Sequence, residues 1–283
     1  MRLALMSDVH GNYQALEAFL AYLEEHPVDG IICLGDYVTD SPYPQKTMKL
    51  LYGMQERYTC YMVRGNREEY LLNNTDNHQG WKPSSVNGIL YYTLQNMTER
   101  DLKFFAALPT ERELILEGVP ALYLCHGTPG RVRGNVNEEE GLRERVMAEL
   151  KYPYLLGGHS HHQEIYIQDG RTYINPGSLG FAIDGVGGRA QFAILTGTTD
   201  RWETELLSIS YDVDSFLEDF KKSGVDEVGM TLSKCNKKCL LTGVNYFYLS
   251  ILAMEEEAKK LGVESIAEIS EEAWKKLEER FEL

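Results

Sequence analysis

The order of predicted elements over the first 63 residues constrains the fold most strongly. Three short apolar segments, residues 2–7, 30–34 and 58–63, have the composition of buried β-strands. Between them lie two predicted helices, one that Asn12 can cap and one over residues 44–55. This alternation predicts an α/β fold whose first strands run parallel and are joined by right-handed crossovers.

The remaining pattern predicts a second sheet and a cap. Helices are expected at 84–96, 98–108 and 138–151, and strands at 111–116, 119–125 and 154–157. Residues 163–208 change to short strands separated by turns, which favours a second, more antiparallel sheet. Two sheets with helices outside them make an α/β sandwich.

From Asp214 onward the pattern is helical. Five apolar residues recur at spacings of four and three and mark one helix face: Phe247, Ile251, Met254, Ala258 and Leu261. We therefore expect a main domain over residues 1–211 and a helical extension over residues 212–283 that packs on it.

Charge and cysteine usage limit the partners and the compartment. The net charge of −15 argues against a nucleic-acid polymer or an anionic membrane as partner, since both require a basic surface. We recognise no signal peptide and no apolar run of the roughly 18 residues that a membrane helix requires. Cys33, Cys60 and Cys125 lie in β-like runs, which is typical of buried, reduced thiols and suggests a cytoplasmic protein. The oligomeric state stays open.

Five short polar clusters each follow the end of an apolar strand. They are Asp8-Val9-His10, Gly35-Asp36, Gly65-Asn66-Arg67-Glu68, His126-Gly127 and Gly158-His159-Ser160-His161. Ligands bind at the carboxyl ends of strands in open α/β sheets, so these clusters should meet at one edge. Seven candidate metal ligands would then converge: Asp8, His10, Asp36, Asn66, His126, His159 and His161.

The ligand types indicate which metals to expect. Oxygen and imidazole ligands without thiolates suit Mn²⁺ or Fe, with Zn²⁺ as an alternative, better than a structural zinc site. In the Asp-x-His and His-x-His pairs, both side chains project to the same side of an extended segment. One such pair alone is more often structural, but five clusters in this order favour a metal centre.

These clusters resemble the motifs of the calcineurin-like metallophosphoesterases, which are D-x-H, G-D, G-N-H-[DE], [GL]-H and G-H-x-H. The resemblance covers residues 1–210 and keeps every metal position. The helical tail looks similar to members of the bacterial phosphodiesterase and asymmetrical diadenosine tetraphosphate hydrolase branch. The resemblance implies a four-layer α/β/β/α sandwich of two mixed sheets, with the C-terminal helical extension added to it.

The resemblance also implies a role for each ligand and two divalent or trivalent metal ions. Asp8, His10 and His161 would bind the first ion. Asn66, His126 and His159 would bind the second, and Asp36 would bridge the two. Asp36, Asn66, Arg67 and His126 would be catalytic, and the last three would also contact the phosphoryl oxygens of the substrate.

Arg67 departs from the family pattern, which often has histidine after Gly-Asn. That histidine is usually assigned to protonating the leaving oxygen. Arginine stays protonated at any working pH, so it cannot be an efficient general acid, although its planar fork can bind phosphate oxygens. Arg67 therefore favours substrates whose leaving group needs little protonation, although His126 or a metal-bound water could still supply a proton.

We interpret the chain as a dinuclear metal-dependent phosphohydrolase of small nucleotide-like diesters or anhydrides, such as dinucleoside polyphosphates. The alternatives are a serine/threonine phosphoprotein or small-monoester phosphatase, and a catalytically weak metal-binding scaffold. Two basic features stay open. Arg131 and Arg133 either contact a distal phosphate or are solvated. Lys234, Lys237 and Lys238 either meet a polyphosphate or lie at the surface.

Overall fold

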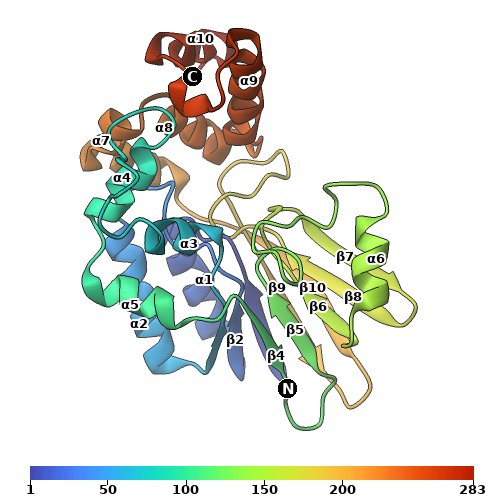
Figure 1. The fold of residues 1–283 in the computed structure, drawn as a ribbon. Coiled ribbons are helices and arrows are strands. Elements are labelled where there is room, and N and C mark those ends of the chain that lie inside the picture. The colour runs from blue at the N-terminus through green and yellow to red at the C-terminus, as the bar shows by residue number, and fades with distance from the viewer.

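The computed structural model describes residues 1–283 and contains two five-stranded mixed sheets flanked by helices (Figure 1). In the first sheet, β1 (Arg2–Met6), β2 (Gly30–Cys33) and β3 (Cys60–Met62) run parallel. Two antiparallel strands, β9 (Arg189–Gly197) and β10 (Trp202–Ser210), extend it on the other side of β1. The sequence prediction of an α/β fold with two mixed sheets is therefore confirmed.

The second sheet has three parallel central strands and two antiparallel edges. Its strands, in spatial order, are β4 (Glu111–Leu114), β5 (Leu122–Cys125), β6 (Tyr154–Leu156), β8 (Arg171–Pro176) and β7 (Gln163–Gln168). The expectation that residues 163–208 form the second sheet was wrong in its pairing. β7 and β8 join β4–β6, whereas β9 and β10 return to the first sheet. Periodicity identifies a strand, but its partner depends on long-range packing.

Three apolar cores separate the four layers. Alternate residues of β1 face opposite sides: Leu3 and Leu5 lie in the core between the sheets, while Ala4 and Met6 face the outer helices. Helices α1 (Tyr13–Glu25) and α2 (Pro44–Arg57) cover the first sheet. Helix α6 (Leu142–Glu149) covers the second with Met147, and it begins four residues later than expected.

Helix α1 follows its sequence signals. The Asn12 side chain accepts a hydrogen bond from the Ala15 N–H at 3.0 Å, which caps the helix. The same side chain donates to the Gly180 carbonyl at 2.9 Å, so this cap also ties the start of α1 to the loop after β8.

The C-terminal helices gather at one end of the sandwich, and three cap helices lie beside the first sheet (Figure 1). The cap helices are α3 (Asn66–Leu72), α4 (Gly88–Gln95) and α5 (Glu99–Ala107), and sequence reasoning missed α3. The C-terminal helices are α7 (Val213–Ser223), α8 (Val225–Thr242), α9 (Tyr246–Leu261), the short 3-10 helix η1 (Ile266–Glu268) and α10 (Glu271–Phe281). None of the helices combines the length and apolarity that a membrane crossing demands.

The C-terminal helices pack on α4 and on one another. Helix α8 contacts α4, and a kink at Met230 (φ 46°, ψ −125°) leaves the Val228 carbonyl free to accept the Ser84 N–H at 3.0 Å. Met254 and Ala258 of the expected apolar face are buried, but Leu261 is 60% exposed. The face stops short of Leu261 because α9 ends there and Gly262 turns the chain in a left-handed conformation.

Candidate metal centre

The five polar clusters meet where β1, β2, β3, β5 and β6 end, as the sequence predicts, but these strands belong to two sheets and not to the single edge that we expected. Five of the seven candidate ligands have left-handed backbone conformations (φ 49–64°): Asp8, His10, Asp36, His159 and His161. This conformation is uncommon outside glycine, and its clustering is typical of functional sites. The strand ends thus turn sharply, which brings the side chains together.

Two close approaches explain the neighbouring glycines. A Cβ on Gly65 would lie 2.1 Å from Asp36 Oδ1, and a Cβ on Gly158 would lie 2.0 Å from Ser7 Oγ. Neither position has room for a side chain, so the sequence places glycine beside the ligands because the loops are packed against one another.

The carboxylates and imidazoles form two groups, each able to hold one metal ion. In the first, Asp8 Oδ1 lies 3.3 Å from His161 Nε2 and 3.6 Å from His10 Nε2. In the second, Asp36, His126 and His159 converge, with Asp36 Oδ2 3.3 Å from His126 Nε2.

Asp36 lies between the two groups. Its Oδ2 is also 3.7 Å from His10 Nε2, so one carboxylate oxygen faces an imidazole of each group. Its other oxygen, Oδ1, accepts the backbone N–H of Arg67 at 2.8 Å, which fixes the carboxylate plane. This position fits a ligand shared by two cations.

Nine buried side-chain atoms have no hydrogen-bond partner. Three of them belong to candidate ligands: Asp8 Oδ1, Asn66 Oδ1 and His126 Nε2. A buried polar atom without a partner costs free energy, so three such atoms gathered among the candidate ligands point to a bound group that would satisfy them. All three are electron-pair donors, and a pair of cations would satisfy them. The residues present therefore fit a dinuclear metal site.

The histidine rings are oriented by their other nitrogens. Nδ1 contacts Asp40 Oδ2 in His10 (2.9 Å), the Leu34 carbonyl in His126 (2.8 Å) and the Phe181 carbonyl in His161 (2.9 Å). With Nδ1 donating to these oxygens, each Nε2 keeps a lone pair for a metal. The Nε2 atoms of His10 and His161 lie only 3.1 Å apart, a spacing that a shared cation explains.

The charges of the site also favour cations. Burial lowers the pKa of His10 and His126, but the surrounding carboxylates outweigh it and raise the pKa to about 10 and about 9. Burial opposes ionisation of Asp8 and Asp36, yet the histidines hold both pKa values low. Burial, reinforced by the charge of His126, lowers the pKa of His159 to about 4. The negative site attracts protons to two rings when it lacks cations, so metals and protons compete for them.

Glu68 fixes the loops that carry the ligands. Its two carboxylate oxygens accept the N–H groups of Asp36 (2.9 Å), Tyr37 (2.8 Å) and Gly65 (2.8 Å). Burial, together with the charge of Asp36, raises the pKa of Glu68 to about 7. One buried side chain therefore couples the β2 loop to the start of α3, a role that the sequence did not reveal.

Asp40 is a further site residue that sequence reasoning missed. Its Oδ2 lies 2.9 Å from His10 Nδ1 and 3.0 Å from Arg67 Nη2, and it accepts the Thr39 hydroxyl at 2.7 Å. Burial opposes its ionisation, but Arg67 and His10 lower its pKa. Its position four residues after Asp36, at the same strand end, was the signal available in the sequence.

Arg67 faces the cleft beside the metal site. Its side chain is 14% exposed, is paired with Asp40, and its guanidinium carbon lies 5.3 Å from the ring centre of Phe247 in α9. Asn236 of α8 donates to the Asp40 carbonyl at 3.0 Å. The C-terminal helices therefore contact the residues that hold Arg67.

A cleft of about 630 Å³ opens over the metal site. Three groups of residues line it beyond the ligands. The C-terminal helices contribute Asn236, Asn245, Phe247 and Tyr248; the loop after β5 contributes Arg133, Asn135 and Asn137; and Phe181 and Ile183 follow β8. The cleft is larger than a single phosphate requires.

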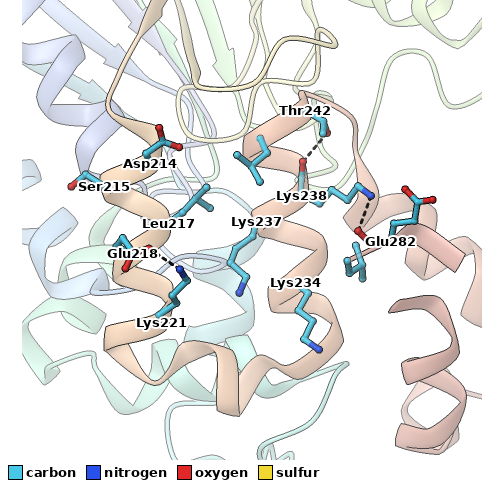
Figure 2. Close-up of a pocket in the computed structure, with 12 residues that line it drawn as sticks. Asp214, Ser215, Leu217, Glu218, Lys221, Lys234, Lys237, Lys238, Thr242 and Glu282 are labelled. Atoms are coloured by element: carbon cyan, nitrogen blue, oxygen red, sulfur yellow. Dashed lines mark hydrogen bonds and ion pairs between the residues drawn. The ribbon is translucent and has the colours of Figure 1, made fainter. Parts of the chain in front are cut away.

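The lysine run lies elsewhere. A separate cavity of about 930 Å³ between α7, α8 and the last residues is lined by Lys221, Lys234, Lys237 and Lys238 (Figure 2). Lys234 pairs with Glu278 and Lys237 with Asp226, each at 2.5 Å, while Lys238 donates to backbone carbonyls of residues 281 and 282. Lys234 and Lys238 therefore tie α8 to α10 and the end of the chain, whereas Lys237 pairs within α8. The polyphosphate interpretation of the run is not supported.

Comparisons with known proteins agree with this geometry. The sequence model of the calcineurin-like phosphoesterase superfamily domain matches residues 1–200. The chain is 25% identical over 241 residues to the uncharacterized protein MJ0912 of Methanocaldococcus jannaschii, covering 80% of this chain and 94% of that protein.

Two solved structures share the fold. The hypothetical protein PH1004 of Pyrococcus horikoshii aligns with a TM-score of 0.72 at 18% identity, covering 86% of this chain and 98% of that chain. A metallophosphoesterase from Sphaerobacter thermophilus aligns with a TM-score of 0.65 at 23% identity, covering 83% of this chain and 100% of that one.

Proposed function

The chain belongs to the calcineurin-like phosphoesterase superfamily, and from that premise we propose that it hydrolyses small nucleotide-like phosphodiesters or phosphoanhydrides with two metal ions. The observation that supports this proposal most directly is the pair of ligand groups that meet at Asp36. Three buried ligand atoms of these groups and of Asn66 have no hydrogen-bond partner. Dinucleoside polyphosphates are the substrates we propose to test first.

We assign the ligands as follows. Asp8, His10 and His161 would hold one ion, Asn66, His126 and His159 would hold the other, and Asp36 would be shared between them. When bound, two cations would supply an activated water molecule and positive charge for the phosphoryl oxygens. Mn²⁺ or Fe suits this set of oxygen and imidazole ligands, with Zn²⁺ as the alternative.

The protein's own groups then set the choice of leaving group. Arg67, oriented by Asp40, donates to the phosphoryl oxygens together with Asn66. His126 is fully buried, its Nδ1 is taken by the Leu34 carbonyl, and its Nε2 is assigned to the metal. Neither nitrogen is then free to protonate a leaving oxygen, which favours nucleotide phosphates and aryl oxides over alkyl alkoxides.

An assay of metal-stripped protein tests the proposal. We expect hydrolysis of bis(p-nitrophenyl) phosphate to be absent after chelation. On addition of Mn²⁺ the rate should rise and reach its maximum when two ions are bound per chain. We also expect diadenosine tetraphosphate to release nucleotides. Release of inorganic phosphate from phosphopeptides, without diester hydrolysis, would favour the monoester phosphatase alternative. Full metal occupancy without any hydrolysis would favour the scaffold.

Substitution of Arg67 tests the leaving-group argument. Arg67→Ala is expected to raise KM and lower kcat for diadenosine tetraphosphate, with a loss of about 1.5–3 kcal/mol for a charged hydrogen bond. Arg67→His restores the residue that the family often has, and should help alkyl monoesters more than aryl diesters. Arg67→Lys is the control that keeps a positive charge beside Asp40. Equal effects of Arg67→His on both leaving-group classes would contradict a limiting proton supply.

A further inference from the structure

One arginine at the cleft has no acidic partner. Arg67 pairs with Asp40, and Arg131 pairs with Glu138. Glu138 is the acidic residue of the cleft that is nearest in sequence to Arg133. Arg133 lines the same cleft and has no carboxylate within 4.0 Å, although the chain carries a net charge of −15. Its positive charge is therefore available to a ligand.

The loop that carries Arg133 is held in shape by its own backbone. It starts at His126, a candidate ligand, and Thr128 and Arg131 exchange backbone hydrogen bonds of 3.0 and 2.8 Å. The Gly134 N–H donates to the Arg131 carbonyl at 2.9 Å, and a Cβ on Gly134 would lie 2.0 Å from Thr128 Oγ1. A fixed loop lowers the entropy cost of using its side chain for binding.

Tyr70 connects this arginine to the metal site. Its ring centre lies 5.9 Å from the guanidinium carbon of Arg67 and 5.6 Å from that of Arg133. The two guanidinium groups therefore border one ring and face one cleft. A phosphate at Arg67 and another further along the same polyphosphate chain could contact both, since guanidinium binds phosphate oxygens through two parallel donors.

We propose that Arg133 binds a second phosphate of the substrate, next to the one that is hydrolysed, and thereby selects polyphosphates over simple diesters. The inference rests on the proposed function, because it assumes that hydrolysis occurs at the metal site. It assigns to Arg133 the distal-phosphate role that the sequence left open, and it assigns no such role to Arg131, whose charge Glu138 neutralises.

The test compares two substrates at a fixed concentration of free Mn²⁺. Diadenosine tetraphosphate carries further phosphates beside the scissile one, whereas bis(p-nitrophenyl) phosphate carries none. In Arg133→Ala we expect the ratio of kcat/KM for the tetraphosphate to that for the aryl diester to fall about tenfold, mainly through KM. Arg133→Lys should recover part of the loss.

Arg131→Ala is the matched control, because it removes an arginine from the same exposed loop and should leave the ratio unchanged. An unchanged ratio in Arg133→Ala, or an equal fall of the ratio in Arg131→Ala, would overturn the inference. The proposed function would not be affected by either result, because the aryl diester would still be hydrolysed. A wild-type protein that hydrolyses neither substrate would refute the proposed function, and the inference would fall with it.

Discussion

Replacement of Asp36 by asparagine is expected to remove metal from both sites and to abolish hydrolysis. Oδ2 of this carboxylate lies 3.7 Å from His10 Nε2 and 3.3 Å from His126 Nε2, so one substitution removes a negative charge from both ligand groups. The loss of metal affinity should exceed the roughly 10–100-fold that follows a change in an outer-shell partner.

The substitution should leave the fold intact. Asp36 has φ 53°, a left-handed conformation that asparagine adopts readily, and the amide oxygen can still accept the Arg67 N–H now bonded to Oδ1. Bound metal per chain would be measured by elemental analysis, and kcat with the aryl diester at saturating Mn²⁺.

Asp76→Asn is the control, because Asp76 is an exposed acid in the loop after α3. A thermal melt of the metal-free proteins should show that Asp36→Asn is folded. Two ions per chain and wild-type kcat in Asp36→Asn would refute the bridging assignment.

The sequence was sufficient for those parts of the site that lie at strand ends. Each motif follows a strand directly, and parallel neighbours within one sheet bring such ends to the same edge. His10 and His161 are 151 positions apart and follow strands of different sheets, so their proximity also depends on how the two sheets pack. The parallel direction of β1, β2 and β3 followed from the alternation of strands and helices.

What the sequence could not provide depends on contacts between distant elements. The return of β9 to β1 is set by packing, as is the contact of Asn236 with Asp40, which are 196 positions apart. Asp40 carries no motif of its own, and only the folded chain shows it between His10 and Arg67. The sequence also did not predict that Phe247 and Tyr248 line the cleft, because an apolar helix face indicates burial but not the surface against which the helix packs.

Deletion of residues 212–283 is expected to give an insoluble or aggregating protein. The extension buries Phe216, Phe220 and Trp274 completely, and its aromatic residues pack against Tyr13, Tyr92 and other residues of the main domain. Removing it would expose Tyr13, Tyr92 and their neighbours in the main domain as an apolar surface, and such surfaces promote aggregation. Soluble yield and the midpoint of thermal unfolding would be compared with those of the full chain.

A pair of glycine substitutions in the full-length chain separates docking of the extension from the general damage of a truncation. A Cβ on Gly88 of α4 would lie 1.8 Å from the Val228 carbonyl oxygen of α8, whereas one on Gly53 of α2 would meet nothing within 4 Å. Gly88→Ala should force α4 and α8 apart and cost about 1–3 kcal/mol of the free energy of unfolding. Gly53→Ala should be neutral or stabilise by up to about 1 kcal/mol, because alanine favours a helix over glycine. If the truncated protein is soluble with an unchanged unfolding midpoint, and Gly88→Ala is as stable as Gly53→Ala, then residues 212–283 are an independent module.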